Sequence, residues 1–282
     1  MDKLILRPRR SVLYMPCSNT RALDKALTLD CDAIIFDLED AVAPDAKAVA
    51  RENIVSYLAN KDFAQRERVV RINHVSSDWG LADLKALAEV DFDAICLPKV
   101  ESTEQLNKAL AVLGKAVPVW VMIETPKGVL NVETIVAHEQ VSVVVMGTND
   151  LAKEMRVKQS IARDEFSFAF GKCIMAARAH GADILDGVYN QLDNMAGFND
   201  VCLQGKCLGF DGKTLIHPKQ LELANNVFSP SNEDVAEAMD IIEAWKSAED
   251  QGVLVVNGRL VEELHVIEAQ RLLSMSEAIA KQ

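Results

Sequence analysis

Three charged residues stand at the ends of short apolar runs, where buried side chains are expected. Glu124 directly follows such a run, Asp150 stands four residues after the end of another, and Arg71 lies within a third. Two carboxylates, completed by water and substrate oxygens, form a common protein site for Mg²⁺. A guanidinium on a buried run needs an anionic partner, and a substrate carboxylate can pair with it through two hydrogen bonds. The pattern predicts a Mg²⁺ site at Glu124 and Asp150, next to an anion site at Arg71.

A second acidic pair, Glu39 and Asp40, follows the run 33–38. We expect these carboxylates to hydrogen-bond metal-bound water and to orient the metal ligands. Other interpretations stay open at this point. Glu124 and Asp150 could each cap the following helix, and Arg71 could form a structural ion pair with Asp37 or Glu39.

Lys99 follows Pro98 at the end of a fourth run and could form a Schiff base, as in a class I aldolase. The acidic cluster favours metal chemistry over this alternative.

Eight short apolar runs must position these residues. They are 12–15, 33–38, 69–72, 94–97, 117–123, 141–146, 182–188 and 214–216. Continuous apolar runs of this length are typical of parallel strands that are buried on both faces. The segments between them show helical apolar spacing, over 21–29, 46–58, 79–90, 103–113, 128–138, 164–180 and 192–203. Ser102 and Asp164 are expected helix N-caps.

Strands alternating with helices predict an α/β TIM (β/α)₈ barrel, whose active site lies at the carboxyl ends of its strands. An open doubly wound sheet is disfavoured because no G-x-G-x-x-G or P-loop motif follows any strand.

The chain changes character after residue 228. The sequence predicts a helix over 232–248, a hairpin turning at Asn257-Gly258 and a final helix. We therefore expect a catalytic barrel over 1–228 and a short helical and hairpin appendage over 229–282, which packs on a neighbouring subunit.

The composition excludes several functional classes. A formal net charge of −12 argues against a nucleic-acid partner, which requires clustered Lys and Arg. No apolar run approaches 18 residues, so no membrane span or membrane partner is expected. The six cysteines form no CxxC pair, which is typical of reduced thiols in a cytoplasmic protein.

Taken in order, these motifs resemble a known family. They are Arg10-Ser11-Val12-Leu13 with Pro16, Asp37-Leu38-Glu39-Asp40-Ala41-Val42, Arg71-Ile72-Asn73, Pro98-Lys99, Ile123-Glu124-Thr125, Gly147-Thr148-Asn149-Asp150-Leu151, and Gly209-Phe210-Asp211-Gly212-Lys213 with Ile216-His217-Pro218. The chain is similar, over about residues 9–219, to the citrate lyase β-subunit-like branch of the HpcH/HpaI aldolase family. That branch includes malyl-CoA, citramalyl-CoA and citryl lyases.

The resemblance implies specific roles for the candidate residues. Glu124 and Asp150 are expected to bind Mg²⁺, Glu124 also to contact the substrate, and Arg71 to contact the carboxylate of the oxo acid. The pair Glu39 and Asp40 is expected to support metal-bound water. The implied substrate is a coenzyme A thioester, the implied product a small 2-oxo acid, and the implied assembly a homotrimer or hexamer.

The sequence departs from the family pattern at two positions. Many members carry Glu before the metal-binding Asp, where this chain has Asn149. Malyl-CoA lyase-like members carry a catalytic Asp in a C-terminal stretch that a neighbouring subunit contributes. Glu262 stands at the matching position here and is the expected general base.

The expected activity is Mg²⁺-dependent carbon–carbon cleavage of a 3-hydroxyacyl-CoA, of the citramalyl-CoA or malyl-CoA type, to a 2-oxo acid and acetyl-CoA. The alternatives are a malyl-CoA thioesterase, the β subunit of a citrate lyase complex acting on a citryl thioester, and a non-catalytic regulator that binds an oxo acid.

Overall fold

The computed structural model describes residues 6–248 and 252–281. The chain divides into two compact units, one over residues 9–226 and the other combining the N-terminal segment up to Pro8 with the chain from Val227 onward. The domain boundary expected after residue 228 stays a prediction.

The first unit is a closed barrel of eight parallel strands, in sequence order around the ring. The strands are β1 (Ser11–Pro16), β2 (Ala33–Asp37), β3 (Glu67–Arg71), β4 (Ala94–Leu97), β5 (Val119–Ile123), β6 (Val141–Met146), β7 (Asp183–Asp186) and β8 (Gly212–Leu215). β1 closes the ring by pairing with both β2 and β8. Each strand overlaps one of the eight apolar runs, and the predicted TIM barrel is confirmed.

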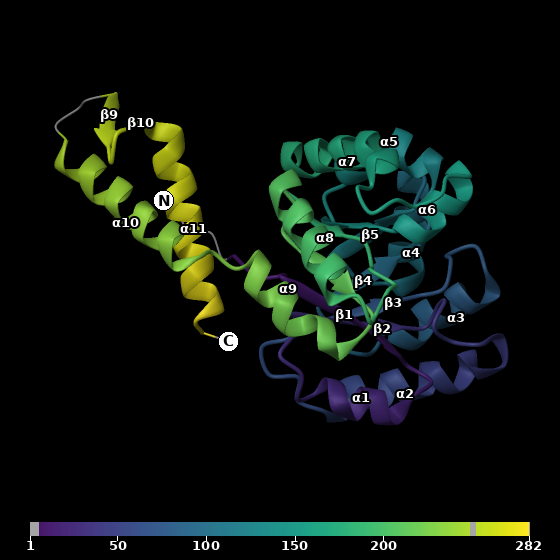
Figure 1. The fold of residues 1–282 in the computed structure, drawn as a ribbon. Helices are drawn as coiled ribbons and strands as arrows, with labels where there is room; N and C mark the ends of the chain where they lie inside the picture. The colour runs from purple at the N-terminus through teal and green to yellow at the C-terminus, as the bar shows by residue number, and fades with distance from the viewer. Residues whose placement is uncertain (1–5, 249–251, 282) are drawn as a thin grey trace. The chain divides into compact units, whose positions relative to one another are not determined.

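Helices surround the strands in this unit (Figure 1). They are α1 (Thr20–Ala26), α2 (Lys47–Asn60), α3 (Asp78–Leu87), α4 (Thr103–Leu113), α5 (Pro126–Val136), α6 (Thr148–Met155), α7 (Ser167–Ala179) and α8 (Met195–Leu208). Short 3₁₀ turns precede α2 and α7 and follow β8, over Pro44–Ala46, Asp164–Phe166 and Pro218–Gln220. Helix α9 (Leu221–Phe228) comes next in the chain.

Two of the predicted helix starts had different outcomes. Ser102 caps α4 in a reciprocal capping box with Gln105, as expected. The prediction that Asp164 is a helix N-cap is wrong, because Asp164 begins a 3₁₀ turn and α7 starts at Ser167. Arg163, just before that turn, has a left-handed backbone with φ of 57°, which changes the direction of the chain there.

Alternate side chains of the strands fill the inside of the barrel, because successive strand residues point to opposite faces. The central cluster comprises Val12, Ala33, Ile35, Val69, Ala94, Cys96, Trp120, Met122, Val143, Val145 and Leu185, with Tyr14 packed against it. Continuing the same alternation by one step reaches Asp37 on β2, Arg71 on β3 and Glu124 after β5. The strand ends therefore turn three charged side chains toward the barrel axis.

The second unit contains a helical hairpin and a small antiparallel ribbon. Helix α10 (Asn232–Ser247) packs on α11 (Glu263–Ile279), and β9 (Val253–Val256) pairs with β10 (Arg259–Glu262). Asn257 and Gly258 both have positive φ, of 48° and 78°, as a two-residue hairpin turn requires. The predicted hairpin is confirmed.

Two further properties bear on the expectations from composition. All six cysteines are free thiols, and five of them are buried. Among the helices that the structure describes, none is long and apolar enough to cross a membrane.

Candidate active site

A cavity of about 310 Å³ opens at the carboxyl ends of the barrel strands. Its wall includes four of the predicted site residues, which are Arg71, Glu124, Asp150 and Asp40. The remaining lining residues are Tyr14, Asp37, Ala41, Met122, Met146, Gly147, Thr148, Asn149, Val188, Asn190, Thr214 and Ile216. The barrel thus brings together the four predicted residues, of which Asp40 and Asp150 lie 110 positions apart in the sequence.

Arg71 is buried and is held from three sides. Its Nε and Nη2 donate to the two carboxylate oxygens of Asp37, at 2.7 and 2.5 Å. Its Nη1 lies 3.0 Å from Glu39 Oε2, and the guanidinium carbon lies 4.7 Å from the ring centroid of Tyr14. The structural ion pair considered above therefore exists, and Arg71 also reaches the cavity. A guanidinium fixed in this way is oriented before an anion arrives.

Glu124 is 3% exposed, and its Oε1 accepts the backbone N–H of Lys99 at 2.8 Å. It does not cap α5, because Thr125 is the N-cap and accepts the N–H of Gly128. Burial, followed by repulsion from the Glu39 carboxylate, raises the pKa of Glu124 to about 7. A buried carboxylate with so few donors is stabilised in its charged form by a nearby cation.

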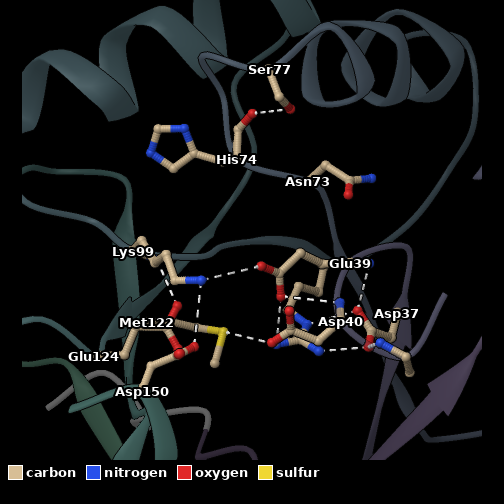
Figure 2. A network of polar contacts seen from close by, with 12 residues as sticks. Asp37, Glu39, Asp40, Asn73, His74, Ser77, Lys99, Met122, Glu124 and Asp150 are labelled. Atoms are coloured by element: carbon tan, nitrogen blue, oxygen red, sulfur yellow. Dashed lines mark hydrogen bonds and ion pairs between the residues drawn. The ribbon is translucent and has the colours of Figure 1, made fainter. Parts of the chain in front are cut away.

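Asp150 is the third residue of α6, whose N-cap is Gly147. The interpretation of Asp150 as an N-cap is therefore wrong. Its Oδ2 lies 3.4 Å from the ammonium nitrogen of Lys99, on the same cavity wall as Glu124. Figure 2 shows the Glu124 and Asp150 side chains below that ammonium group.

Glu39 and Asp40 both stand beside the Arg71 guanidinium. Glu39 is 8% exposed, and burial, partly offset by Arg71, raises its pKa to about 7. The Asp40 carboxylate is more exposed and stands 3.8 Å from Arg71 Nη1. Both residues thus contact the guanidinium, whereas their expected role beside metal-bound water stays a prediction.

The residues at this site fit a hard divalent cation. Across residues 6–248 and 252–281, no group of three or more His, Cys, Asp or Glu converges as a protein-only metal cage. Mg²⁺ does not require one, since one or two carboxylates with water and substrate oxygens suffice. Glu124 and Asp150 supply that oxygen set, and the ammonium of Lys99 already lies against Asp150. The site therefore attracts positive charge.

Lys99 itself does not have the properties of a Schiff-base lysine. Burial lowers its pKa, but Glu39 and Asp150 outweigh burial and hold the pKa above its usual value. A nucleophilic lysine requires the opposite shift.

Asp37 and Tyr14 are site residues that were not among the sequence candidates for function. The signal that identifies them is alternation along the strand. Tyr14 lies two residues after Val12, and Asp37 lies two after Ile35, so both point inward with the core cluster.

The same alternation places Asp186 on the outer face of its strand. Asp186 follows the inward-facing Leu185 and points outward, where it pairs with Arg163 and Lys213 at 2.7 and 2.8 Å. Lys213 also donates to the carbonyl of Gly187. This buried group joins β7 and β8 to the chain before α7 and does not line the cavity.

Glu262 lies in the second unit, at the N-terminus of α11. Its backbone N–H donates to Nδ1 of His265 at 3.0 Å. Its assignment as general base stays a prediction.

The model of the HpcH/HpaI aldolase/citrate lyase family matches residues 10–218. The chain belongs to this family. The match covers the barrel strands and every cavity residue named above, so the expected resemblance is confirmed.

Relatives in the HpcH/HpaI family carry two kinds of name. A (3S)-malyl-CoA thioesterase of Cereibacter sphaeroides is 50% identical over 275 residues, which cover 97% of this chain and 96% of that protein. The citrate lyase subunit beta of Escherichia coli is 32% identical over 284 residues, covering 96% of this chain and 94% of that subunit.

Solved structures of HpcH/HpaI relatives include bound ligands. The CitE protein of Mycobacterium tuberculosis, in complex with magnesium, acetoacetate and coenzyme A, superposes with a TM-score of 0.82. It is 25% identical, and the match covers 97% of this chain and all of that one. The citrate lyase beta subunit of the same organism, complexed with oxaloacetate and magnesium, gives a TM-score of 0.71 at 25% identity, over 79% of this chain and 98% of that one.

Proposed function

We propose that this protein is a Mg²⁺-dependent thioesterase that hydrolyses a malyl-CoA-type thioester to the free hydroxy acid and coenzyme A. The observation that carries the choice of reaction is the 50% identity, over nearly the whole chain, to proteins named (3S)-malyl-CoA thioesterase. The cavity supports the substrate class, because it places a fixed guanidinium beside two carboxylates that can hold a metal.

The chain's own residues suggest how the substrate is bound. Arg71 binds the free carboxylate of the malyl group, and Asp37 and Tyr14 keep the guanidinium in position. Glu124 and Asp150 would hold Mg²⁺, which supplies Lewis-acid polarisation of substrate oxygens when bound. Asn149 and Asn190 also line the cavity, and Asn190 Nδ2 donates to Asn149 Oδ1 at 2.8 Å.

The barrel also contains a base suited to hydrolysis. Glu39 is buried beside Arg71, and with a pKa of about 7 it can both accept and return a proton near neutral pH. In this proposal Glu39 accepts a proton from water as the water oxygen adds to the thioester carbonyl carbon. The carbon–sulfur bond then breaks, and the proton passes to the departing thiolate.

Carbon–carbon lysis is the second candidate, and the family match favours it. The substrate would bind in the same way, but the base would remove the proton from the substrate hydroxyl. The bond between the hydroxyl carbon and the CH₂ beside the thioester would then break, leaving a 2-oxo acid and a thioester enolate, and this enolate takes up a proton to give acetyl-CoA. This route uses Glu262 as the base, contributed by a neighbouring subunit in a homotrimer or hexamer.

The products distinguish the two reactions. The purified protein is incubated with malyl-CoA, with Mg²⁺ or with EDTA, and free coenzyme A, malate, glyoxylate and acetyl-CoA are quantified by mass spectrometry. Hydrolysis predicts equal amounts of malate and free coenzyme A that depend on Mg²⁺. Glyoxylate and acetyl-CoA in equal amounts would overturn hydrolysis in favour of lysis. Inactivity on every free coenzyme A ester would instead support a citrate lyase subunit.

The metal site has its own test. Glu124→Gln and Asp150→Asn are expected to abolish Mg²⁺-dependent turnover. Glu154→Gln changes an exposed carboxylate on the same helix as Asp150 and should leave turnover unchanged. Full Mg²⁺-dependent activity in the first two variants would remove Glu124 and Asp150 from the metal site.

The assembly is tested separately. Light scattering after size-exclusion chromatography is expected to give the mass of three or six chains, and a monomer that retains full activity would contradict a base contributed by a neighbour.

A further inference from the structure

Lys99 has an unusual backbone for a residue with a side chain. Its φ is +50°, in the left-handed region that favours glycine. Two hydrogen bonds hold this conformation. The Lys99 N–H donates to Glu124 Oε1 at 2.8 Å, and the Lys99 carbonyl accepts from Gln105 Nε2 at 3.3 Å. Strained backbone of this kind persists where its surroundings fix it, and it is common at functional sites.

This backbone places the Lys99 ammonium among the acidic side chains of the cavity. Nζ lies 3.4 Å from Asp150 Oδ2 and 3.9 Å from Glu39 Oε1. Figure 2 shows the side chain reaching between these two carboxylates, above Glu124. One residue therefore contacts three carboxylates, two through its ammonium and one through its backbone N–H.

The ammonium stands where a metal ion on Glu124 and Asp150 would repel it. Both cations require the same Asp150 carboxylate, and two positive charges a few ångströms apart oppose each other in a site with little water. Nζ has no other partner at hydrogen-bond or ion-pair distance within the described part of the chain, and the side chain is 36% exposed. Withdrawal of Lys99 toward solvent thus breaks only its two ion pairs, with Asp150 and Glu39.

We propose that Lys99 is an internal counter-cation, which keeps Glu39, Glu124 and Asp150 assembled without metal and leaves Asp150 when Mg²⁺ binds. The inference rests on the proposed function in one respect, that Glu124 and Asp150 hold the metal. It explains why a strained lysine lies inside an acidic cluster, and it makes the metal affinity depend on a residue that is not a ligand.

The test measures metal binding rather than turnover. Mn²⁺ replaces Mg²⁺ as the probe, and free Mn²⁺ is followed by electron paramagnetic resonance at pH 8. Lys99→Met is expected to bind Mn²⁺ roughly tenfold more tightly than the unmodified protein, the change expected when one competing ion pair is lost. The matched control is Lys61→Met, which removes the same charge from an exposed site after α2, where Lys61 lies 4.0 Å from Asp24. The control should bind Mn²⁺ with unchanged affinity.

The outcomes separate this inference from the proposed function. Equal or weaker Mn²⁺ binding by Lys99→Met overturns the counter-cation but leaves the metal site intact. Absence of Mn²⁺ binding in both proteins overturns the metal site and the counter-cation together.

A second measurement uses the unmodified protein and does not depend on the variant folding. Acetylation of individual lysines is followed by peptide mass spectrometry with and without Mg²⁺. Mg²⁺ should accelerate acetylation at Lys99 severalfold and leave Lys61 unchanged. Unchanged or slower acetylation at Lys99 would contradict its withdrawal from the cluster.

Discussion

Asp37 and Arg71 meet inside the barrel through two parallel hydrogen bonds, from Nε at 2.7 Å and from Nη2 at 2.5 Å. The pair joins the last residues of β2 and β3, which are register partners in the sheet. Asp37 is fully buried, so it fixes the direction of the guanidinium and leaves Nη1 as the group nearest Glu39 and the cavity.

Replacing Arg71 by Lys is expected to weaken substrate binding. A lysine keeps the charge but cannot hold Asp37 with two donors and a substrate carboxylate at the same time. Loss of one charge-assisted hydrogen bond predicts a KM increase of roughly 10- to 100-fold. Steady-state kinetics with the coenzyme A thioester measures it. Arg68→Lys is the control, because Arg68 lies on the same strand but pairs with Asp91 and Asp93 instead. An unchanged KM in Arg71→Lys would remove Arg71 from carboxylate binding.

Gly147 leaves room for the Glu124 side chain. A Cβ at position 147 would overlap Glu124 Cβ and Oε2. Gly147→Ala should therefore push the carboxylate out of place and weaken Mg²⁺ binding by roughly tenfold or more. Isothermal titration calorimetry measures this affinity. Gly171→Ala adds a methyl group to open space on α7 and should leave the affinity unchanged. Normal Mg²⁺ binding by Gly147→Ala would show that the position of Glu124 does not govern the site.

The raised pKa of Glu124 predicts two opposite pH dependences. Metal binding requires the carboxylate, so Mg²⁺ affinity should rise as pH increases through about 7.

The stability of the metal-free protein should change with pH in the opposite direction. The folded-state pKa of Glu124 lies above its unfolded value of about 4.3, so this residue stabilises the fold fully below that value. That contribution is lost as pH rises through about 7. Thermal unfolding and Mg²⁺ titrations between about pH 5 and 8 measure both trends, and Glu124→Gln should flatten each of them. A wild-type Tm that rises over this range would contradict the assignment.

The buried group around Asp186 should affect stability and not metal binding. Asp186→Asn leaves Arg163 and Lys213 buried without their shared counter-charge. Breaking a buried pair in this way costs about 3–5 kcal/mol, or a fall in Tm of roughly 10 °C for a chain of this size. Asp193→Asn is the control, since its exposed pair with Lys219 should contribute little. A Tm change equal to that of the control would mean that the buried group does not support the barrel.

The sequence predicted the barrel because parallel strands buried on both faces leave long apolar runs. It predicted Arg71, Glu124 and Asp150 at one cavity because those runs all end on the same face. It could have identified Asp37 and Tyr14 as well, since both continue the inward alternation of their strands.

Other parts of the site have no readable signal in the sequence. The left-handed backbone of Lys99 depends on hydrogen bonds with Glu124, which follows β5, and with Gln105 on α4, and these residues meet only in the folded barrel. The pairing of Asp186 with Arg163 and Lys213 likewise joins residues that are distant in the sequence and meet only in the folded barrel.

The alternation that turns Asp37, Arg71 and Glu124 inward has a consequence for insertions and deletions. Removing one residue from β2 ahead of Asp37 would bring Leu38 to the axis and turn the carboxylate toward the helices. The length of each strand ahead of its last inward-facing residue is then constrained as tightly as the identity of that residue. Changes in length that preserve the chemistry must fall in the connections at the opposite end of the barrel or in the helices.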